Sequence, residues 1–148
     1  MKFFDFLHVL DPNIDPANCK LHLAKSDGEN GALDVFRRGE FEAWQASQSR
    51  RNFEREHIIA LISYAGADTW LFAGCYDAGD CVQEAGDEFG NEGKRYIYST
   101  QERAFTKDFS GRVVVNFQRS GRQSYLNAEK NVDDLTIHEV LAERETFS

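Results

Sequence analysis

Apolar residues recur at three- and four-residue steps over residues 3–10, which predicts a short helix with one apolar face. Asp11 and Pro12 end this pattern, and a second turn is expected to begin near Pro16. Residues 20–25 then alternate between apolar and polar positions, which predicts a short strand at a sheet edge. The chain is therefore expected to open with helical turns and to enter a sheet soon afterwards.

Two further helices are predicted before the main run of strands. After a loop over residues 26–31, a short helix is expected over residues 32–38, with Gly39 as its stop. A second helix is predicted over residues 41–48, where three side chains share one face: Phe41, Trp44 and Gln48. Together with the helix at residues 3–10, these N-terminal helices would cover one opening of the sheet that follows.

The most apolar stretch is residues 57–64, whose nearly continuous Ile and Leu content predicts a strand buried on both faces. A turn at residues 65–68 leads into a second strand over residues 69–77, so the two strands are expected to form a hairpin. Gly74 lies inside the second strand, which indicates a bulge or a close backbone approach there.

Short strands with turn signals fill the rest of the chain. Residues 78–93 are acidic and contain several glycines, which predicts a long loop. Four further strands are predicted, over residues 95–99, 111–118, 123–126 and 135–141. The strands at 111–118 and 123–126 are expected to form a hairpin. Roughly six or seven strands after short N-terminal helices favour an α+β domain, with a strongly curved mixed or antiparallel sheet or a half-open β-barrel.

The length of 148 residues and the 41% hydrophobic content are those of one globular domain, so we expect a single domain over residues 1–148. The chain has no apolar run of membrane-spanning length and no signal-peptide cleavage pattern. Its three cysteines form no even disulfide framework, which favours a reduced, cytoplasmic protein.

The net charge of −8 argues against a simple nucleic-acid-binding surface, but the charges are sorted along the chain. Residues 77–92 contain six acids and no base, and residues 133–148 contain five acids and one base. Residues 37–55 contain five bases and three acids, and residues 94–130 contain eight bases and three acids. Such sorting is also typical of an ordinary solvated surface, so both interpretations stay open.

The chain contains no recognisable catalytic, metal or cofactor motif. Its four histidines have no partner at zinc-ligand spacing, and the acidic residues 77–92 lack the spacing of a calcium loop. No serine lies in a nucleophile-elbow pattern, and no glycine pattern follows a strand to hold phosphate. Residues 96–98 match half of a GIY-YIG nuclease signature, but the rest of that signature is missing. We therefore expect no enzymatic centre, metal or cofactor within these residues.

Basic and aromatic side chains form the remaining pattern. Arginine pairs with phosphates, glutamine can bind an adenine edge, and an aromatic ring can stack on an extruded base. The predicted nucleic-acid contacts are Arg37, Arg38, Trp44, Gln45, Gln48, Arg50, Arg51, Arg119 and Arg122. In the alternative interpretation, Phe41 and Trp44 cover the mouth of the barrel and the glutamines face water.

Three segments resemble a bacterial domain found ahead of GIY-YIG nuclease domains in restriction-type endonucleases: residues 41–48 (FEAWQASQ), 57–62 (HIIALI) and 70–74 (WLFAG). Residues 1–7, 111–115 and 122–126 also fit, so the likeness covers nearly the whole chain. The nuclease half is missing from this sequence. The resemblance therefore implies a non-catalytic recognition module with a PUA-like or similar pseudobarrel fold.

The leading hypothesis is a DNA-binding specificity domain of a restriction-modification endonuclease, which reads a modified or a flipped base. Its expected partners are double-stranded DNA, modified or unmodified, and a C-terminal nuclease domain in the same chain, with residues 142–145 as the start of the linker. A homodimer stays open, and no membrane is expected. The rival hypotheses are a protein-interaction or scaffolding domain without nucleic-acid binding, and a small-molecule-binding barrel.

Overall fold

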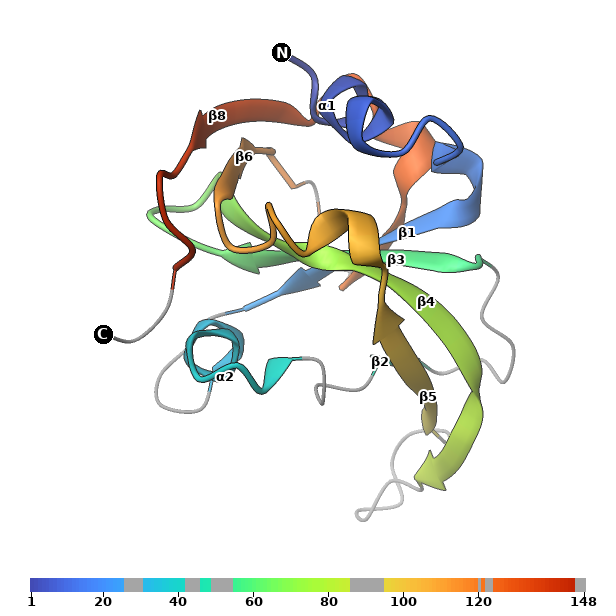
Figure 1. Ribbon diagram of the computed structural model, residues 1–148. Helices are drawn as coiled ribbons and strands as arrows, with labels where there is room; N and C mark the ends of the chain where they lie inside the picture. The colour runs from blue at the N-terminus through green and yellow to red at the C-terminus, as the bar shows by residue number, and fades with distance from the viewer. Residues whose placement is uncertain are drawn as a thin grey trace.

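The protein combines short helices with one sheet, as the α+β prediction required (Figure 1). A computed structural model describes residues 1–25, 31–41, 46–48, 55–85, 95–119, 121 and 124–145. The helical elements are α1 (Phe3–Leu10), η1 (Pro16–Asn18), α2 (Ala32–Arg37), η3 (Ala104–Thr106) and η4 (Ala128–Lys130). The strands are β1 (Cys19–Ala24), β2 (Ala46–Gln48), β3 (His57–Ser63), β4 (Thr69–Ala85), β5 (Arg95–Glu102), β6 (Val113–Asn116), β7 (Tyr125–Asn127) and β8 (Thr136–Val140).

The sheet is mixed and open. Its strand order is β2-β5-β4-β3-β1-β7, and β6 pairs with both β4 and β8. The β1–β3 pair is parallel, and the other pairs among the described strands are antiparallel. The long strand β4 pairs with β3 and β6 along its first half and continues outward with β5, which gives the sheet its strong curvature (Figure 1).

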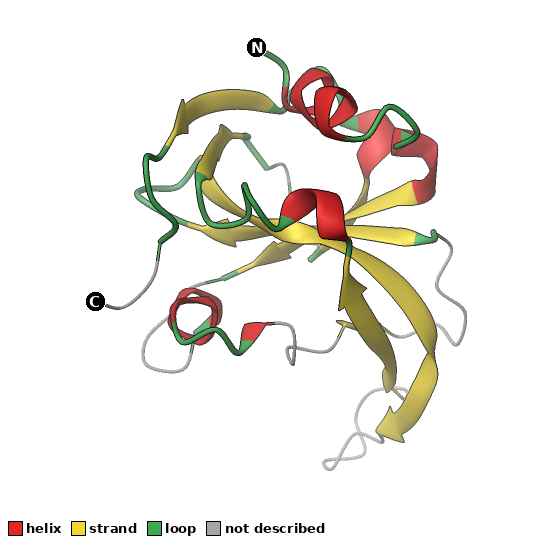
Figure 2. Cartoon of the chain, in the orientation of Figure 1, coloured by secondary structure: helices red, strands yellow, loops and turns green. Residues whose placement is uncertain are grey.

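Apolar side chains fill both faces of this sheet. Residues of α1 pack on one face with alternate residues of β1, such as Leu21 and Leu23. Phe36 of α2 packs on the opposite face with Ile58 and Ile62 of β3. Both faces of β3 are therefore buried, as its continuous apolar sequence predicted. The two helices lie on opposite sides of the sheet (Figure 2), so the prediction that they cover one opening is wrong.

The β3–β4 hairpin confirms both structural expectations for Gly74. Ile59 pairs with Cys75 and Leu61 pairs with Phe72, so two residues of β4 lie opposite one residue of β3 in a bulge. Gly74 has φ +115°, and a Cβ atom there would lie 2.8 Å from a carboxylate oxygen of Glu102. The positive φ favours glycine at this position, whereas the Glu102 carboxylate ends a flexible side chain that can move.

Four local predictions are wrong because pairing with another segment of the chain decides the conformation. Strand β1 lies between β3 and β7 and is not an edge strand. Strand β7 pairs with β1, so it does not form the predicted hairpin with β6. Residues 78–85, predicted as loop, continue β4 and pair with β5. Residues 46–48, predicted as helix, form β2 and also pair with β5. Three predicted segments cannot be compared with the structure, because they lie outside the described residues. They are the loop at residues 26–30, the rest of the acidic loop at 86–93, and residues 42–45 of the predicted second helix.

The N-terminal residues join the last strand of the sheet. Lys2 forms a bridge to Thr136, and the N–H of Phe3 donates to the carbonyl of Leu135 at 3.0 Å. The Lys2 ammonium lies 2.5 Å from the Asp133 carboxylate, which raises the pKa of Lys2 through that hydrogen bond. Within the described ranges, no helix has the length and apolar character needed to cross a membrane.

Candidate nucleic-acid interface

The C-terminal end of α2 forms one wall of an open cavity of about 470 Å³. The helix ends at Arg37 and Arg38, and Gly39 follows with φ +75°, which confirms the predicted stop. The N–H groups of Gly39 and Glu40 donate to carbonyls of the last helical turn, as in a Schellman motif. The cavity is lined by Phe36, Arg37, Arg38, Gly39, Phe41, Tyr76, Glu102, Lys107 and Arg144.

Three aromatic rings form the apolar part of this cavity. The rings of Phe36 and Phe41 meet edge to face with centroids 5.9 Å apart, and Phe41 lies 6.2 Å from Tyr76. The Tyr76 hydroxyl donates to the carbonyl of Ala73 at 2.8 Å. All three rings are at least 94% buried, so the wall is fixed by the core on this face of the sheet.

The C-terminal residues 141–145 supply the opposite wall. The backbone N–H groups of Leu141 and Glu145 donate to the carbonyls of Arg112 and Gly111. The Arg144 guanidinium lies 4.8 Å from the centre of the Phe36 ring, a cation–π contact. Residues 142–145 therefore pack on the domain, and the prediction that they begin a linker is wrong.

A carboxylate from the same segment binds α2. Arg37 donates from Nε and Nη2 to Oε1 of Glu145, at 3.1 and 2.6 Å. The Tyr64 hydroxyl donates to the other oxygen of that carboxylate at 3.1 Å. Burial and this hydrogen bond together raise the pKa of Tyr64. The Glu145 side chain thus occupies an anion-binding position formed by an arginine and a tyrosine.

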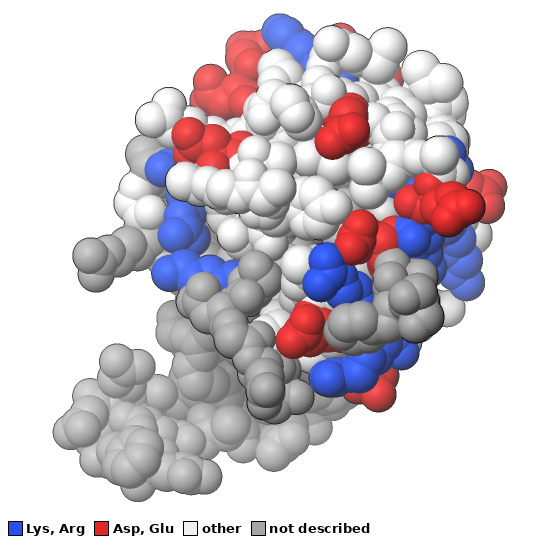
Figure 3. Space-filling model, turned by 90° about the vertical axis from the view of Figure 1, so that its left-hand side faces the viewer, with Lys and Arg blue, Asp and Glu red and all other residues white. Residues whose placement is uncertain are grey.

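The remaining cations of the cavity are more accessible. Arg38 lies 3.4 Å from the exposed carboxylate of Glu40. Lys107 and Arg144 are exposed and form no ion pair with any residue in the described ranges. Figure 3 shows the side of the molecule that is on the left in Figure 1, where α2 and the C-terminus lie. Basic and acidic side chains intermingle at the lower right of this face, acidic ones predominate at its upper left, and a group of basic ones lies along its left edge.

The predicted contact residues do not all lie at this cavity. Arg119 lines a second cavity with Trp70, and its guanidinium lies 5.9 Å from the centre of the indole. Lys25 also lines that second cavity, and its carbonyl accepts from the N–H of Ala32 at the start of α2. The six residues of α2 span about 9 Å. The two basic groups therefore lie toward opposite ends of one short helix.

Most of the other predicted contacts lie outside the described residues: Trp44, Gln45, Arg50, Arg51 and Arg122. Gln48 belongs to β2, where it pairs with Tyr96, and its side chain is not described. Sequence reasoning did not select Tyr76, Lys107 or Arg144 as contact residues. Each comes from a different segment, and no local spacing marks them, because only the pairing of β4 with β5 and the packing of residues 141–145 bring them together.

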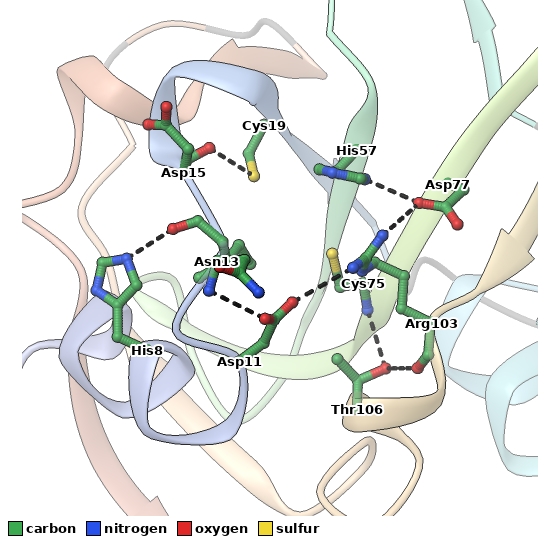
Figure 4. Close-up of polar contacts among 11 residues, drawn as sticks. His8, Asp11, Asn13, Asp15, Cys19, His57, Cys75, Asp77, Arg103 and Thr106 are labelled. Carbon is green, nitrogen blue, oxygen red and sulfur yellow. Dashed lines mark hydrogen bonds and ion pairs between the residues drawn. The ribbon is translucent and has the colours of Figure 1, made fainter.

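A separate polar cluster joins α1, β3, β4 and η3 (Figure 4). The Asp77 carboxylate binds Nδ1 of His57 at 2.8 Å and Nη1 of Arg103 at 2.9 Å. Arg103 also reaches the Asp11 carboxylate at 3.3 Å. The nearby thiol of Cys19 is fully buried and donates to a backbone carbonyl. Burial raises the pKa of Cys19 to about 12, so this cluster holds no thiolate at neutral pH and acts as a structural tie.

Together these features define an α+β domain with an open mixed sheet and a basic, aromatic cavity at the end of α2. Comparisons of the chain with protein-family models, curated protein sequences and solved structures found no match. What this domain binds must therefore be argued from its own side chains.

Proposed function

We propose that this chain is a DNA-recognition domain that holds an extruded base in the cavity at the end of α2. The observation that supports this proposal is a cavity lined by three fixed aromatic rings and by four cations and one carboxylate, Glu102. The nearly buried rings form an apolar floor for the base, and Arg and Lys bind the flanking phosphates. A volume of about 470 Å³ lies in the range of pockets that enclose small ligands and accommodates one base.

The predicted base-contacting segment begins at this cavity. Phe41 lines it, and the chain continues directly into Trp44 and Gln45. The resemblance to recognition modules of GIY-YIG endonucleases rests partly on that segment. We infer that the chain serves such a nuclease as its specificity domain, reading a modified or flipped base.

The acidic character of the protein shapes the expected mode of binding. A net charge of −8 opposes the approach of a polyanion, so sequence-independent affinity is expected to be low. Binding then depends on the few cations at the cavity and on capture of the base. The proposal therefore predicts that the domain binds some duplexes much more tightly than others. It does not predict general, sequence-independent DNA binding.

This function is tested by fluorescence anisotropy with duplexes that are unmodified or carry a modified cytosine or adenine. Replacing Lys107 and Arg144 by Gln should weaken binding about three- to ten-fold each and reduce the salt slope by about one for each phosphate that is no longer bound. Lys130→Gln is the matched control, because Lys130 is exposed on η4 and does not line the cavity. Unchanged affinity and slope in both cavity variants, or no binding by the parent protein at low salt, would refute the proposal.

Glu145 offers a second test of the same site. Since the Glu145 carboxylate neutralises part of the positive charge of Arg37, Glu145→Gln should make this position more favourable for a phosphate and raise DNA affinity several-fold. Loss of this partly buried pair should lower the free energy of unfolding by about 1 kcal/mol. Glu143→Gln makes the same change of charge at an exposed neighbouring position. Equal effects of the two variants on DNA affinity would mean that Arg37 does not contact DNA.

A further inference from the structure

The second cavity lies where the parallel strands β1 and β3 end. It has a volume of about 360 Å³, and its polar lining comes from Lys25 after β1, Ser63 at the end of β3, Asp68 before β4, and Arg119. The Trp70 side chain also lines it. Three segments, which contain Lys25, residues 63–70 and Arg119, therefore converge on one opening at the carboxyl ends of the parallel strands β1 and β3.

The Arg119 guanidinium is held in place but has no polar partner among the described residues. It lies across the Trp70 ring, and that ring is 3% exposed and fixed by a hydrogen bond from Nε1 to the carbonyl of Phe117 at 2.9 Å. Nη1 of Arg119 is buried and finds no acceptor in the described part of the chain. An unpaired buried donor is unfavourable, and more so on a charged group. An acceptor supplied by a ligand would remove that penalty.

The charges of the lining indicate which acceptor fits. Lys25 and Arg119 carry positive charge, and Asp68 carries the one negative charge among the described lining residues. Neither cation forms an ion pair with a residue in the described ranges. The excess of one positive charge matches a singly charged oxyanion, whereas Asp68 would repel a second negative charge on the ligand. The planar guanidinium fork suits two oxygens of one phosphate or carboxylate group.

We propose that this cavity is a binding site for a singly charged oxyanion, held by Arg119 and Lys25 beside Trp70. Among phosphates the charge balance favours a phosphodiester over a monoester, whether it belongs to a nucleic-acid backbone or to a small molecule. Asp68 selects against doubly charged phosphate monoesters and accepts a hydrogen bond from a hydroxyl of the ligand. The site does not depend on base capture at the other end of α2.

The test uses the indole Nε1–H signals of the protein in ¹H–¹⁵N NMR spectra. The chain has two tryptophans, so a Trp44→Phe variant assigns the Trp70 signal. Dimethyl phosphate, acetate and methyl phosphate are titrated separately at constant ionic strength, because they differ in oxyanion type and charge. We expect the Trp70 signal to shift saturably with dimethyl phosphate and to respond at least ten-fold less strongly to methyl phosphate at pH 8.

Substitutions then locate the site. Arg119→Gln should weaken dimethyl phosphate binding at least ten-fold, Arg119→Lys should weaken it less, and Lys130→Gln should leave it unchanged. Asp68→Asn should reduce the difference in affinity between dimethyl phosphate and methyl phosphate. An unresponsive Trp70 signal, or the same response in Arg119→Gln, would overturn the proposal.

The source of the oxyanion is read from two further titrations. Tighter binding of acetate than of dimethyl phosphate would overturn the phosphodiester assignment. A short duplex that competes with dimethyl phosphate would identify a nucleic-acid backbone as the source, and a duplex that does not compete would identify a small molecule. Because this readout uses Trp70 alone, it can fail while DNA binding at the α2 cavity persists, and the reverse also holds.

Discussion

His22 should make this protein sensitive to mild acid. Its ring stacks on Tyr125, with centroids 4.6 Å apart and an angle of 13° between the planes. The residue lies on β1 between Ala60 of β3 and Tyr125 of β7. Burial lowers the pKa of His22 from 6.5 to about 4, because the charged imidazolium is less well hydrated there than in water.

The sign of the effect follows from proton binding in the two states. Between pH 6.5 and pH 4 the unfolded chain binds a proton at His22 and the folded chain does not, so acid favours unfolding. The stabilisation is present in full above pH 6.5 and is lost as the pH falls toward 4. Linkage gives a loss of about 2 kcal/mol between pH 7 and pH 5, and about 3 kcal/mol once the pH falls below 4.

The matched variant is His22→Phe, which keeps an aromatic ring against Tyr125 but cannot bind a proton. Urea unfolding of both proteins at pH 7, 6 and 5 gives the free energy of unfolding at each pH. The other histidines and the carboxylates are common to both proteins, so their contributions cancel in the difference. That difference should change by about 2 kcal/mol from pH 7 to pH 5. Parallel pH curves for the two proteins would refute the reasoning.

Two further predictions concern the interior. Gly111→Ala should lower the free energy of unfolding by about 2–4 kcal/mol in urea, because φ is +81° and the new Cβ would lie 2.8 Å from the buried Phe36 ring. Gly121→Ala, with φ +87° and open space around it, should cost only about 1 kcal/mol, and equal losses would contradict this account. Cys19 and Cys75 should react with a thiol reagent at pH 8 at rates on the order of one hundredth that of a free thiol or less, because burial raises the pKa of both. Mass spectrometry should find both modified in urea, and rapid labelling in the native protein would show that these strands open.

The sequence was most informative where local pattern and tertiary environment agree. The apolar run over residues 57–64 predicted a strand buried on both faces, and β3 (His57–Ser63) lies there because both sheet faces are covered. The helical period over residues 3–10 predicted α1, and Gly39 predicted the end of α2. In each case the sequence of one segment is enough to specify its secondary structure, and the tertiary contacts agree with that local preference.

Prediction failed where a distant partner decides the conformation. Residues 46–48 lie in a stretch with helical spacing, yet pairing with β5 makes them a strand. Residues 78–85 are polar enough for a loop, yet the same partner extends β4 through them. The candidate site has the same origin. Arg37 and Arg38 could be selected from the sequence, whereas Lys107 and Arg144 join them only through packing.

The pairing of residues 2 and 3 with the segment that leads into β8 has a consequence for folding during protein synthesis. The apolar face of α1 contains Phe3, Phe4 and Leu7, but the backbone partners of Lys2 and Phe3 are Thr136 and Leu135. A ribosome adding about 5–20 residues per second needs about 7–27 seconds to reach those partners. During that interval the β3–β4 hairpin can form and the aromatic face of α1 can pack on β1 and Phe72, while the backbone partners of Lys2 and Phe3 are still missing. The pairing that ties Lys2 and Phe3 to the sheet is therefore completed only after β8 has been synthesised.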